Sequence, residues 1–270
     1  MDANVQGSTL ADGAYYSFLV GGQHNAISTN AGLSVLGGGF NNVASGFESA
    51  VGGGEGNVAS GGGSFIGGGL TNTASGGDAA IVGGGLNVAS GLYSLIGAGV
   101  FNGATNSGSI VIGGGFLNAA TNYGSAVVAG SGNVAGGFES FVGGGEANVA
   151  SGVLSVIGGG YFNGATGFGS VVPGGYANSA AGTNSWAGGA FASAVHHGAF
   201  VWSDNSATRD LVFGPITAGR TYTLEYATGV GSGTFTTVSA AASSDNGTTR
   251  TITDNAGDPH RFYRVRISLP

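Results

Sequence analysis

The sequence predicts an all-β solenoid, a rod made of short coils that stack on one another. Three observations predict it: an asparagine returns every fifteen residues, serine and glycine registers accompany it at the same spacing, and the residues after each serine are mostly β-branched or aromatic. Self-similarity at a fixed period indicates units that pack only against their sequence neighbours. The array extends from about residue 15 to about residue 200.

The asparagine register contains ten copies and one sixteen-residue step. Its members are Asn42, Asn57, Asn72, Asn87, Asn102, Asn118, Asn133, Asn148, Asn163 and Asn178. We expect a ladder in which each amide bonds the backbone of its own turn and the amide one coil away, because a buried amide needs all its partners. The alternative is that these asparagines only adopt a left-handed turn conformation. Either role is structural.

The serine register completes the repeat unit, roughly S-x-[VI]-G-G-G-x-x-N-x-A-[ST]-G-x-x. It runs from Ser34 to Ser185 with Ala79 in its one gap, and the unit that begins at Ser17 is longer, at seventeen residues. Apolar pairs after the serine predict one strand of each coil, and lighter pairs such as Val58-Ala59 predict the second. The expected first-strand pairs are Phe65-Ile66, Leu95-Ile96, Val111-Ile112, Val127-Val128, Phe141-Val142, Val156-Ile157 and Val171-Val172.

Charges are few and unevenly placed. Only 7% of the 270 residues are charged and 41% are hydrophobic, a composition that argues against disorder. All six basic residues are arginines between Arg209 and Arg266, so residues 1–208 carry eight acids and no base. Such a surface repels phosphate backbones, and we expect no nucleic-acid partner. No apolar run approaches the roughly 20 residues that cross a bilayer, so we expect no membrane insertion.

The composition changes near residue 208, which suggests the domain boundaries. We expect a lead-in over residues 1–14, the repeat rod over 15–208 with a capping segment at 194–204, and a small antiparallel β-domain over 209–270. In that last part Tyr222, Leu224 and Tyr226 alternate with polar residues, and the final strand alternates in the same way. Period-two alternation predicts four or five strands of a sandwich-like module.

The repeat resembles the heads of trimeric autotransporter adhesins and related fibre proteins. The match covers about residues 15–205 and is most specific at its end, Ala194-Val195-His196-His197-Gly198-Ala199-Phe200-Val201-Trp202-Ser203-Asp204, which looks like the segment that caps such arrays. The resemblance implies a left-handed parallel β-roll, assembly as a homotrimer, and a surface or fibre role. The expected cap residues are His196, His197, Phe200, Trp202 and Asp204.

The C-terminal segment carries a second resemblance. Arg261-Phe262-Tyr263-Arg264-Val265-Arg266, together with Gly219-Arg220-Thr221-Tyr222, is similar to a small β-domain at the C-termini of large secreted bacterial proteins. The whole fold class is therefore expected to be all-β, a trimeric parallel β-roll followed by a small antiparallel β-sandwich-like module.

No group of residues predicts an enzyme. His196 and His197 are adjacent, and neighbouring side chains on a strand point to opposite faces, which favours structural capping over a metal site; three copies of one histidine on a threefold axis remain the alternative. The chain contains no cysteine, and no lysine follows its glycine runs as a phosphate loop requires. We expect no catalytic residue, no cofactor and no metal.

Glu48 and Glu139 occupy equivalent positions of the repeat, as do Glu55 and Glu146. Within each copy, Glu48 with Glu55 and Glu139 with Glu146, the two acids could resemble the carboxylate pair of glycoside hydrolysis. Their repetition on a periodic surface favours solvated charges. Apolar residues also recur after the glycine run, for example Phe40, Phe116 and Tyr176, and a row of exposed aromatic side chains predicts lateral self-association.

We therefore expect a non-enzymatic structural or adhesive fibre protein, extracellular or at the cell surface, whose trimeric rod supports attachment to an unknown receptor or glycan. One alternative is a phage tail fibre or contractile-injection-system fibre, located in a particle. Another is a self-assembling extracellular filament or matrix subunit. A polysaccharide-active spike is a further alternative that would need an acidic cleft between chains.

Overall fold

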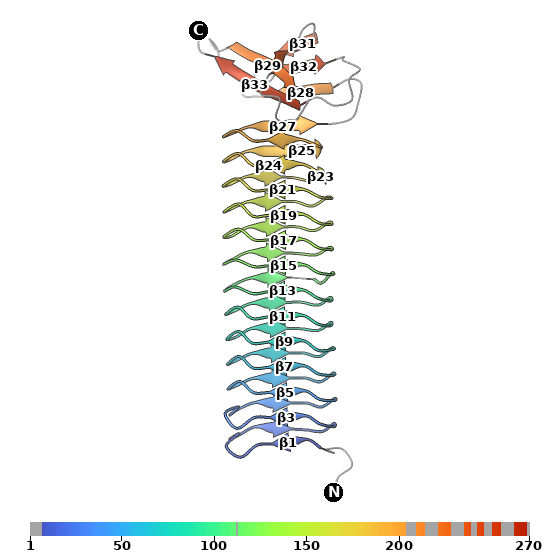
Figure 1. Cartoon of the computed structure of the whole chain (residues 1–270), viewed down its shortest axis with the longest axis vertical. Helices are drawn as coiled ribbons and strands as arrows, with labels where there is room; N and C mark the ends of the chain where they lie inside the picture. Colours follow the sequence, from blue (N-terminus) through green and yellow to red (C-terminus); the bar gives the residue numbers. More distant parts are fainter. Residues whose placement is uncertain are drawn as a thin grey trace.

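The protein is described by a computed structural model for residues 7–111, 113–203, 209–213, 221–227, 235–238, 242–245, 250–254 and 262–268. These residues form strands and turns without a helix. The larger part is a parallel β-solenoid, and a small antiparallel module lies at its C-terminal end (Figure 1). The predicted all-β solenoid of about 15-residue coils is confirmed.

Each coil contributes one short strand to each of two parallel sheets, which we call sheet A and sheet B. Sheet A has 13 strands, in the order β1 (Thr9–Leu10), β3 (Ala26–Ile27), β5 (Val43–Ala44), β7 (Val58–Ala59), β9 (Thr73–Ala74), β11 (Val88–Ala89), β13 (Gly103–Ala104), β15 (Ala119–Ala120), β17 (Val134–Ala135), β19 (Val149–Ala150), β21 (Gly164–Ala165), β24 (Ser179–Ala180) and β26 (Ser193–Ala194). The parallel ladder thus already includes Thr9, within the segment expected as a lead-in.

Sheet B has 14 strands, of which 13 follow one path and one pairs beside it. The order is β2 (Phe18–Leu19), β4 (Val35–Leu36), β6 (Ala50–Val51), β8 (Phe65–Ile66), β10 (Ala80–Ile81), β12 (Leu95–Ile96), β14 (Ile110–Val111), β16 (Ala126–Val127), β18 (Phe141–Val142), β20 (Val156–Ile157), β22 (Val171–Val172), β25 (Trp186–Ala190) and β23 (Gly175–Tyr176), with β27 (Phe200–Ser203) paired to β25. A third ladder of single bridges runs from Gln23 to Tyr176.

The pairing is in register from coil to coil, so equivalent residues lie above one another. Val58 pairs with Thr73, and Ala59 pairs with Ala74, fifteen residues on. Neighbouring strands in a sheet are about 4.8 Å apart, so the 13 strands of sheet A span about 58 Å. The repeat period therefore sets both the register and the length of the rod.

Two of the expected strand pairs were placed one residue too late. Val111-Ile112 and Val127-Val128 were expected, whereas the strands are Ile110–Val111 and Ala126–Val127, directly after the serine as in the other coils. Val127 is fully buried. The extra residue of the sixteen-residue step falls after the strand, near three consecutive glycines with positive φ, Gly113, Gly114 and Gly115.

The core is a narrow column filled by the chain itself. The second residue of each strand points inward except in β1 and β23. Alanines of sheet A such as Ala59 and Ala74 therefore face larger residues of sheet B such as Val51 and Ile66, all fully buried. Alternation of side chains along a strand places the first residue of each pair outside. Because the inward residues of sheet B are large, the narrow core leaves room only for small residues such as alanine on sheet A.

The C-terminal module contains two three-stranded antiparallel sheets. One consists of β28 (Arg209–Phe213), β32 (Arg250–Asp254) and β31 (Ala242–Asp245); the other consists of β30 (Thr236–Thr237), β29 (Thr221–Ala227) and β33 (Phe262–Ser268). The described residues thus hold six strands, where four or five were expected. β30 and β31 are short and rich in Ser, Thr and Ala, so they lack a clear alternating pattern.

The module is joined to the rod at its end. β33 contacts β27, the last strand of the solenoid (Figure 1). Leu224 and Tyr263 form its small described core, against which Tyr226, Val238 and Val265 pack. In the described part of the chain, no helix has the length and apolarity to cross a bilayer.

Candidate functional surfaces

The ladder asparagines lie inside the rod, and Asn57 shows their hydrogen bonding. Its Nδ2 donates to the carbonyl oxygens of Gly53 at 3.0 Å and Gly69 at 2.9 Å, and to Asn42 Oδ1 at 3.1 Å. Its Oδ1 accepts from the backbone N and the Nδ2 of Asn72, at 3.0 and 3.1 Å. Every ladder amide is buried, and all but that of Asn118 donate at least two hydrogen bonds through Nδ2. The role this geometry gives the amide is structural.

The ladder starts earlier and ends differently from its expected members. Asn25 belongs to it, since the backbone N of Asn42 donates to Asn25 Oδ1 at 3.0 Å. Asn25 was not assigned to the register because it lies seventeen residues before Asn42, although two glycines precede it as in other coils. At the C-terminal end Asn178 Oδ1 accepts from the backbone N of Ala192 at 2.9 Å. An alanine therefore replaces the asparagine in the last coil.

The buried serines form a less complete ladder. Ser34 Oγ donates to the Gly46 carbonyl oxygen at 2.9 Å and accepts from the backbone N of Ser49 at 3.1 Å. Ser64 Oγ is buried without a hydrogen-bond partner, and the next coil carries Ala79 where a serine would stand.

This difference predicts opposite outcomes for two alanine substitutions. We expect Ser34→Ala to lower the free energy of unfolding by about 1–2 kcal/mol, because the hydroxyl's bonds to Gly46 O and to the backbone N–H of Ser49 are lost, and that N–H keeps only a longer bond to Gly46 O at 3.3 Å. Ser64→Ala removes a buried hydroxyl that bonds nothing, so we expect a change within about 0.5 kcal/mol or a small gain. Urea unfolding followed by circular dichroism measures both. Equal losses in the free energy of unfolding would contradict the difference in hydrogen bonding between Ser34 and Ser64.

The expected cap residues lie at the C-terminal end of the solenoid. His196 and His197 are exposed in the turn between β26 and β27, not on a strand, so the alternation argument used for them does not apply. Phe200 and Trp202 lie on β27, and both rings stack on Trp186, with centroids 4.3 and 5.8 Å apart. Asp204 lies outside the described residues.

The paired acids are kept apart by the fold. Glu48 lies in the turn between β5 and β6, and Glu55 lies in the bridge ladder between β6 and β7. Glu139 and Glu146 repeat this arrangement further along the rod. The described residues contain no group of three or more His, Asp or Glu side chains arranged to hold a metal ion.

Among the described residues, the outer surface of sheet B carries only apolar side chains. We call it the sheet B face and define it by the first residue of each strand and the residue two positions later, which alternation places on the same side. The first row is Phe18, Val35, Ala50, Phe65, Ala80, Leu95, Ile110, Ala126, Phe141, Val156, Val171, Trp186 and Phe200. The second row, where described, is Val20, Gly37, Gly52, Gly67, Val82, Gly97, Val128, Gly143, Gly158, Pro173, Gly188 and Trp202.

Glycines make this face flat. A Cβ atom on Gly67 would lie 3.6 Å from Phe65 Cε1, and one on Gly143 would lie 3.5 Å from Phe141 Cε1, so both rings extend over a glycine of their own coil. The rings remain 43% and 37% exposed. The outer side of sheet A differs, because serines and threonines such as Ser45, Ser60 and Thr105 follow its strands.

A second exposed set consists of the residues just before each ladder asparagine, which we call the pre-asparagine row. These residues have left-handed backbone, yet several are large: Leu86, Phe101, Leu117, Phe162 and Phe191 have φ between 55° and 58°. They are 38–53% exposed. Glycine occupies the position in other coils, as at Gly56 and Gly132. An L-residue there costs about 1–2 kcal/mol of backbone strain. Edge contacts with neighbouring aromatic rings offset part of this cost at Phe101, Phe162 and Phe191.

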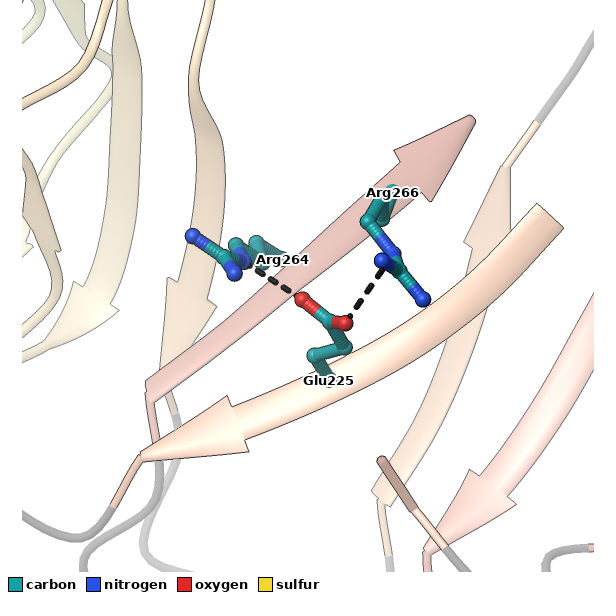
Figure 2. Close-up of polar contacts among 3 residues, drawn as sticks. All are labelled: Glu225, Arg264 and Arg266. Atoms are coloured by element: carbon teal, nitrogen blue, oxygen red, sulfur yellow. Dashed lines mark hydrogen bonds and ion pairs between the residues drawn. The ribbon is translucent and has the colours of Figure 1, made fainter. Parts of the chain in front are cut away.

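The C-terminal module contains a buried acid between two arginines (Figure 2). Glu225 Oε2 accepts from Arg264 Nε at 2.7 Å, and Glu225 Oε1 lies 3.1 Å from Arg266 Nε. The Glu225 side chain is 7% exposed, whereas those of Arg264 and Arg266 are 40% and 61% exposed. This cluster was not predicted, although the alternation already placed Arg264 and Arg266 on one face of the last strand.

No protein-family model matches the chain, and no curated protein is significantly similar to it.

Proposed function

We propose that the protein is a non-enzymatic structural and adhesive fibre component, extracellular or at the cell surface, whose rods associate laterally as trimers through the sheet B face. The carrying observation is that face itself: an unbroken apolar strip on a protein whose narrow core is already filled by its own side chains. Monomeric soluble proteins rarely expose apolar patches beyond a few hundred Å².

The dimensions of the face suit a stable interface. It is about 60 Å long and about 10 Å wide, from the strand spacing and three residues of strand. Three such faces turned toward a common threefold axis would each remove about 600 Å² from water, on the order of 1,800 Å² in total, which lies in the range of specific interfaces. The flat profile that Gly67 and Gly143 give to Phe65 and Phe141 allows the three sheets to approach that axis closely.

Charge placement supports the same face. The acids described in the rod do not lie on sheet B. Asp12, Glu48, Asp78 and Glu139 lie in the turns that lead from sheet A to sheet B, and Glu55 and Glu146 lie in the bridge ladder. Because residues 1–208 contain no base, rods repel one another at these edges. The sheet B face brings no charge out of water, so association there avoids the desolvation of ions.

The edges of the rod would then stay outside the trimer. The pre-asparagine row and the neighbouring exposed aromatics Phe40, Phe116 and Tyr176 are interrupted by Glu55 and Glu146 along the bridge ladder. A mixed apolar and acidic surface suits contact with a receptor or glycan. We propose that attachment uses this edge, and that the sheet B face holds the copies together.

The test places a charge on each surface in turn. We expect Phe65→Glu combined with Phe141→Glu to dissociate the oligomer, because buried like charges would meet at the interface. The matched control is Phe116→Glu with Tyr161→Glu, at exposed positions of the bridge ladder where Glu55 and Glu146 occur naturally. Sedimentation velocity reports the mass of each variant, and circular dichroism confirms that the rod is folded. If the oligomer persisted with Phe65→Glu and Phe141→Glu but dissociated with Phe116→Glu and Tyr161→Glu, the interface would lie on the bridge ladder and not on the sheet B face.

A further inference from the structure

We infer that the C-terminal module binds acidic polysaccharide through Arg264 and Arg266, and that it gives the rod a second, end-on attachment site in addition to the edge proposed above. The inference rests on the proposed attachment function, to which it adds a further site and the class of ligand that this site takes. Two independent observations carry it: the separation of charge along the molecule, and the geometry of the arginine pair.

Charge is polarised along the rod. Residues 1–208 contain eight acids and no base, a net charge of −8, whereas residues 209–270 contain six arginines and five acids, a net charge of +1; together these give the −7 of the chain. The module lies at one end of the solenoid (Figure 1). An anionic surface therefore repels the body of the rod and attracts this end, at separations up to a Debye length of about 8–10 Å.

The arginine pair is held in a fixed arrangement. Arg264 lies directly opposite Glu225 in the antiparallel pairing of β29 with β33, and Arg266 follows two residues later on the same face. One buried carboxylate binds both side chains through Nε, so it balances one of their two positive charges. Figure 2 shows the two guanidinium groups on either side of the Glu225 carboxylate.

The donors that remain are suited to a second oxyanion. A guanidinium has five N–H donors in a rigid fork, and the carboxylate contact at Nε engages one edge of each. Arg264 is further fixed by Phe235, whose ring centroid lies 3.9 Å from Arg264 Cζ. Both side chains are partly exposed. Because both arginine side chains are oriented before binding, they lose less conformational entropy when a carboxylate or sulfate binds.

The size of the site favours polysaccharide over nucleic acid. Two guanidinium groups with a net charge of +1 can engage one oxyanion at a time, which matches a polymer that carries single carboxylate or sulfate groups on its sugars. Nucleic-acid binding depends on neutralising several adjacent phosphates. Within the described residues the nearest solenoid elements contribute no base, because residues 1–208 contain none.

Binding of the full-length protein to immobilised polymers tests the inference. The probes are a polyuronate, a sulfated polysaccharide, a neutral polysaccharide and double-stranded DNA, with free inorganic phosphate as competitor. We expect the protein to bind one of the acidic polysaccharides, with an affinity that falls as the salt concentration rises. Arg266→Gln should lower this affinity about tenfold, which is the size of effect expected when an exposed hydrogen bond to a charged group is lost. Arg266→Gln leaves Glu225 paired with Arg264. Comparing polyuronate with sulfated polymer identifies which oxyanion is bound.

Two further variants keep the test decisive. The triple variant Glu225→Gln, Arg264→Gln, Arg266→Gln removes the pair without leaving a buried unpaired charge and should abolish binding, whereas Glu139→Gln, in an exposed turn of the rod, should leave it unchanged. The inference would be overturned if Arg266→Gln left the affinity for acidic polysaccharide unchanged. It would also be overturned if the protein bound DNA as tightly as, or more tightly than, acidic polysaccharide. Absence of binding to every acidic polymer would also overturn it, while the oligomer mass of the same sample would still decide the proposed fibre.

Discussion

Replacement of Gly84 by alanine is expected to lower the free energy of unfolding by about 3 kcal/mol or more. Gly84 has a φ of 91°, and a Cβ there would overlap the carbonyl oxygen of Gly99 in the next coil and lie 2.8 Å from Asn87 Nδ2. Left-handed strain and overpacking contribute about 1–3 kcal/mol each. Gly99 O and Gly99 N are backbone atoms, so relief of their overlap would require the coils to separate. Urea unfolding followed by circular dichroism measures the loss.

The adjacent glycine provides the control. A Cβ on Gly83 would meet no atom within 4 Å, and its φ is not in the left-handed region. Gly83→Ala should therefore change the free energy of unfolding by less than about 1 kcal/mol and can stabilise, since alanine restricts the unfolded chain. Similar losses at the two positions would show that coil spacing is not what requires glycine.

The second large effect is expected for Asn87→Ala. The substitution removes three donor contacts of Asn87 Nδ2, to Asn72 Oδ1, Gly83 O and Gly99 O, and two contacts accepted from Asn102. It leaves the backbone N–H of Asn102 buried without this acceptor and opens a small cavity. We expect a loss of about 3 kcal/mol or more in the free energy of unfolding.

Asn118 is the graded control, because the sixteen-residue step has already weakened its bonding. Its Nδ2 donates to Gly130 O at 2.8 Å, and the amide accepts from the backbone N and Nδ2 of Asn133 at 3.1 Å each. Asn118→Ala should cost about 1 kcal/mol less than Asn87→Ala, measured in the same way. A larger loss at Asn118 would show that the number of ladder contacts does not determine stability.

The repeat period made the solenoid predictable. A fifteen-residue asparagine spacing can place equivalent residues above one another only if each coil adds one strand to each sheet, and the pairing of Val58 with Thr73 follows that spacing. The same reasoning failed near Ile110, where the inserted residue shifted the register and two adjacent apolar pairs fitted the pattern equally well. Asn25 was missed because its coil is two residues longer than the period.

The surfaces were harder to predict than the fold. A two-residue strand is too short for its alternation to be visible, so the sequence does not tell whether Phe65 or Ile66 points inward; burial of Ile66 settles it. The ion pair of Glu225 with Arg264 depends on antiparallel register between segments 39 residues apart. The sequence showed the alternation on each strand but not which residues face each other.

The native mass of the full-length protein by light scattering tests the central claim most directly. Three chains of 25.9 kDa predict a mass of about 77.7 kDa, three times the chain mass, that persists on dilution and in high salt because the sheet B face carries no charge. A stable species of 25.9 kDa at all concentrations would contradict lateral association and leave the rod as a solitary solenoid.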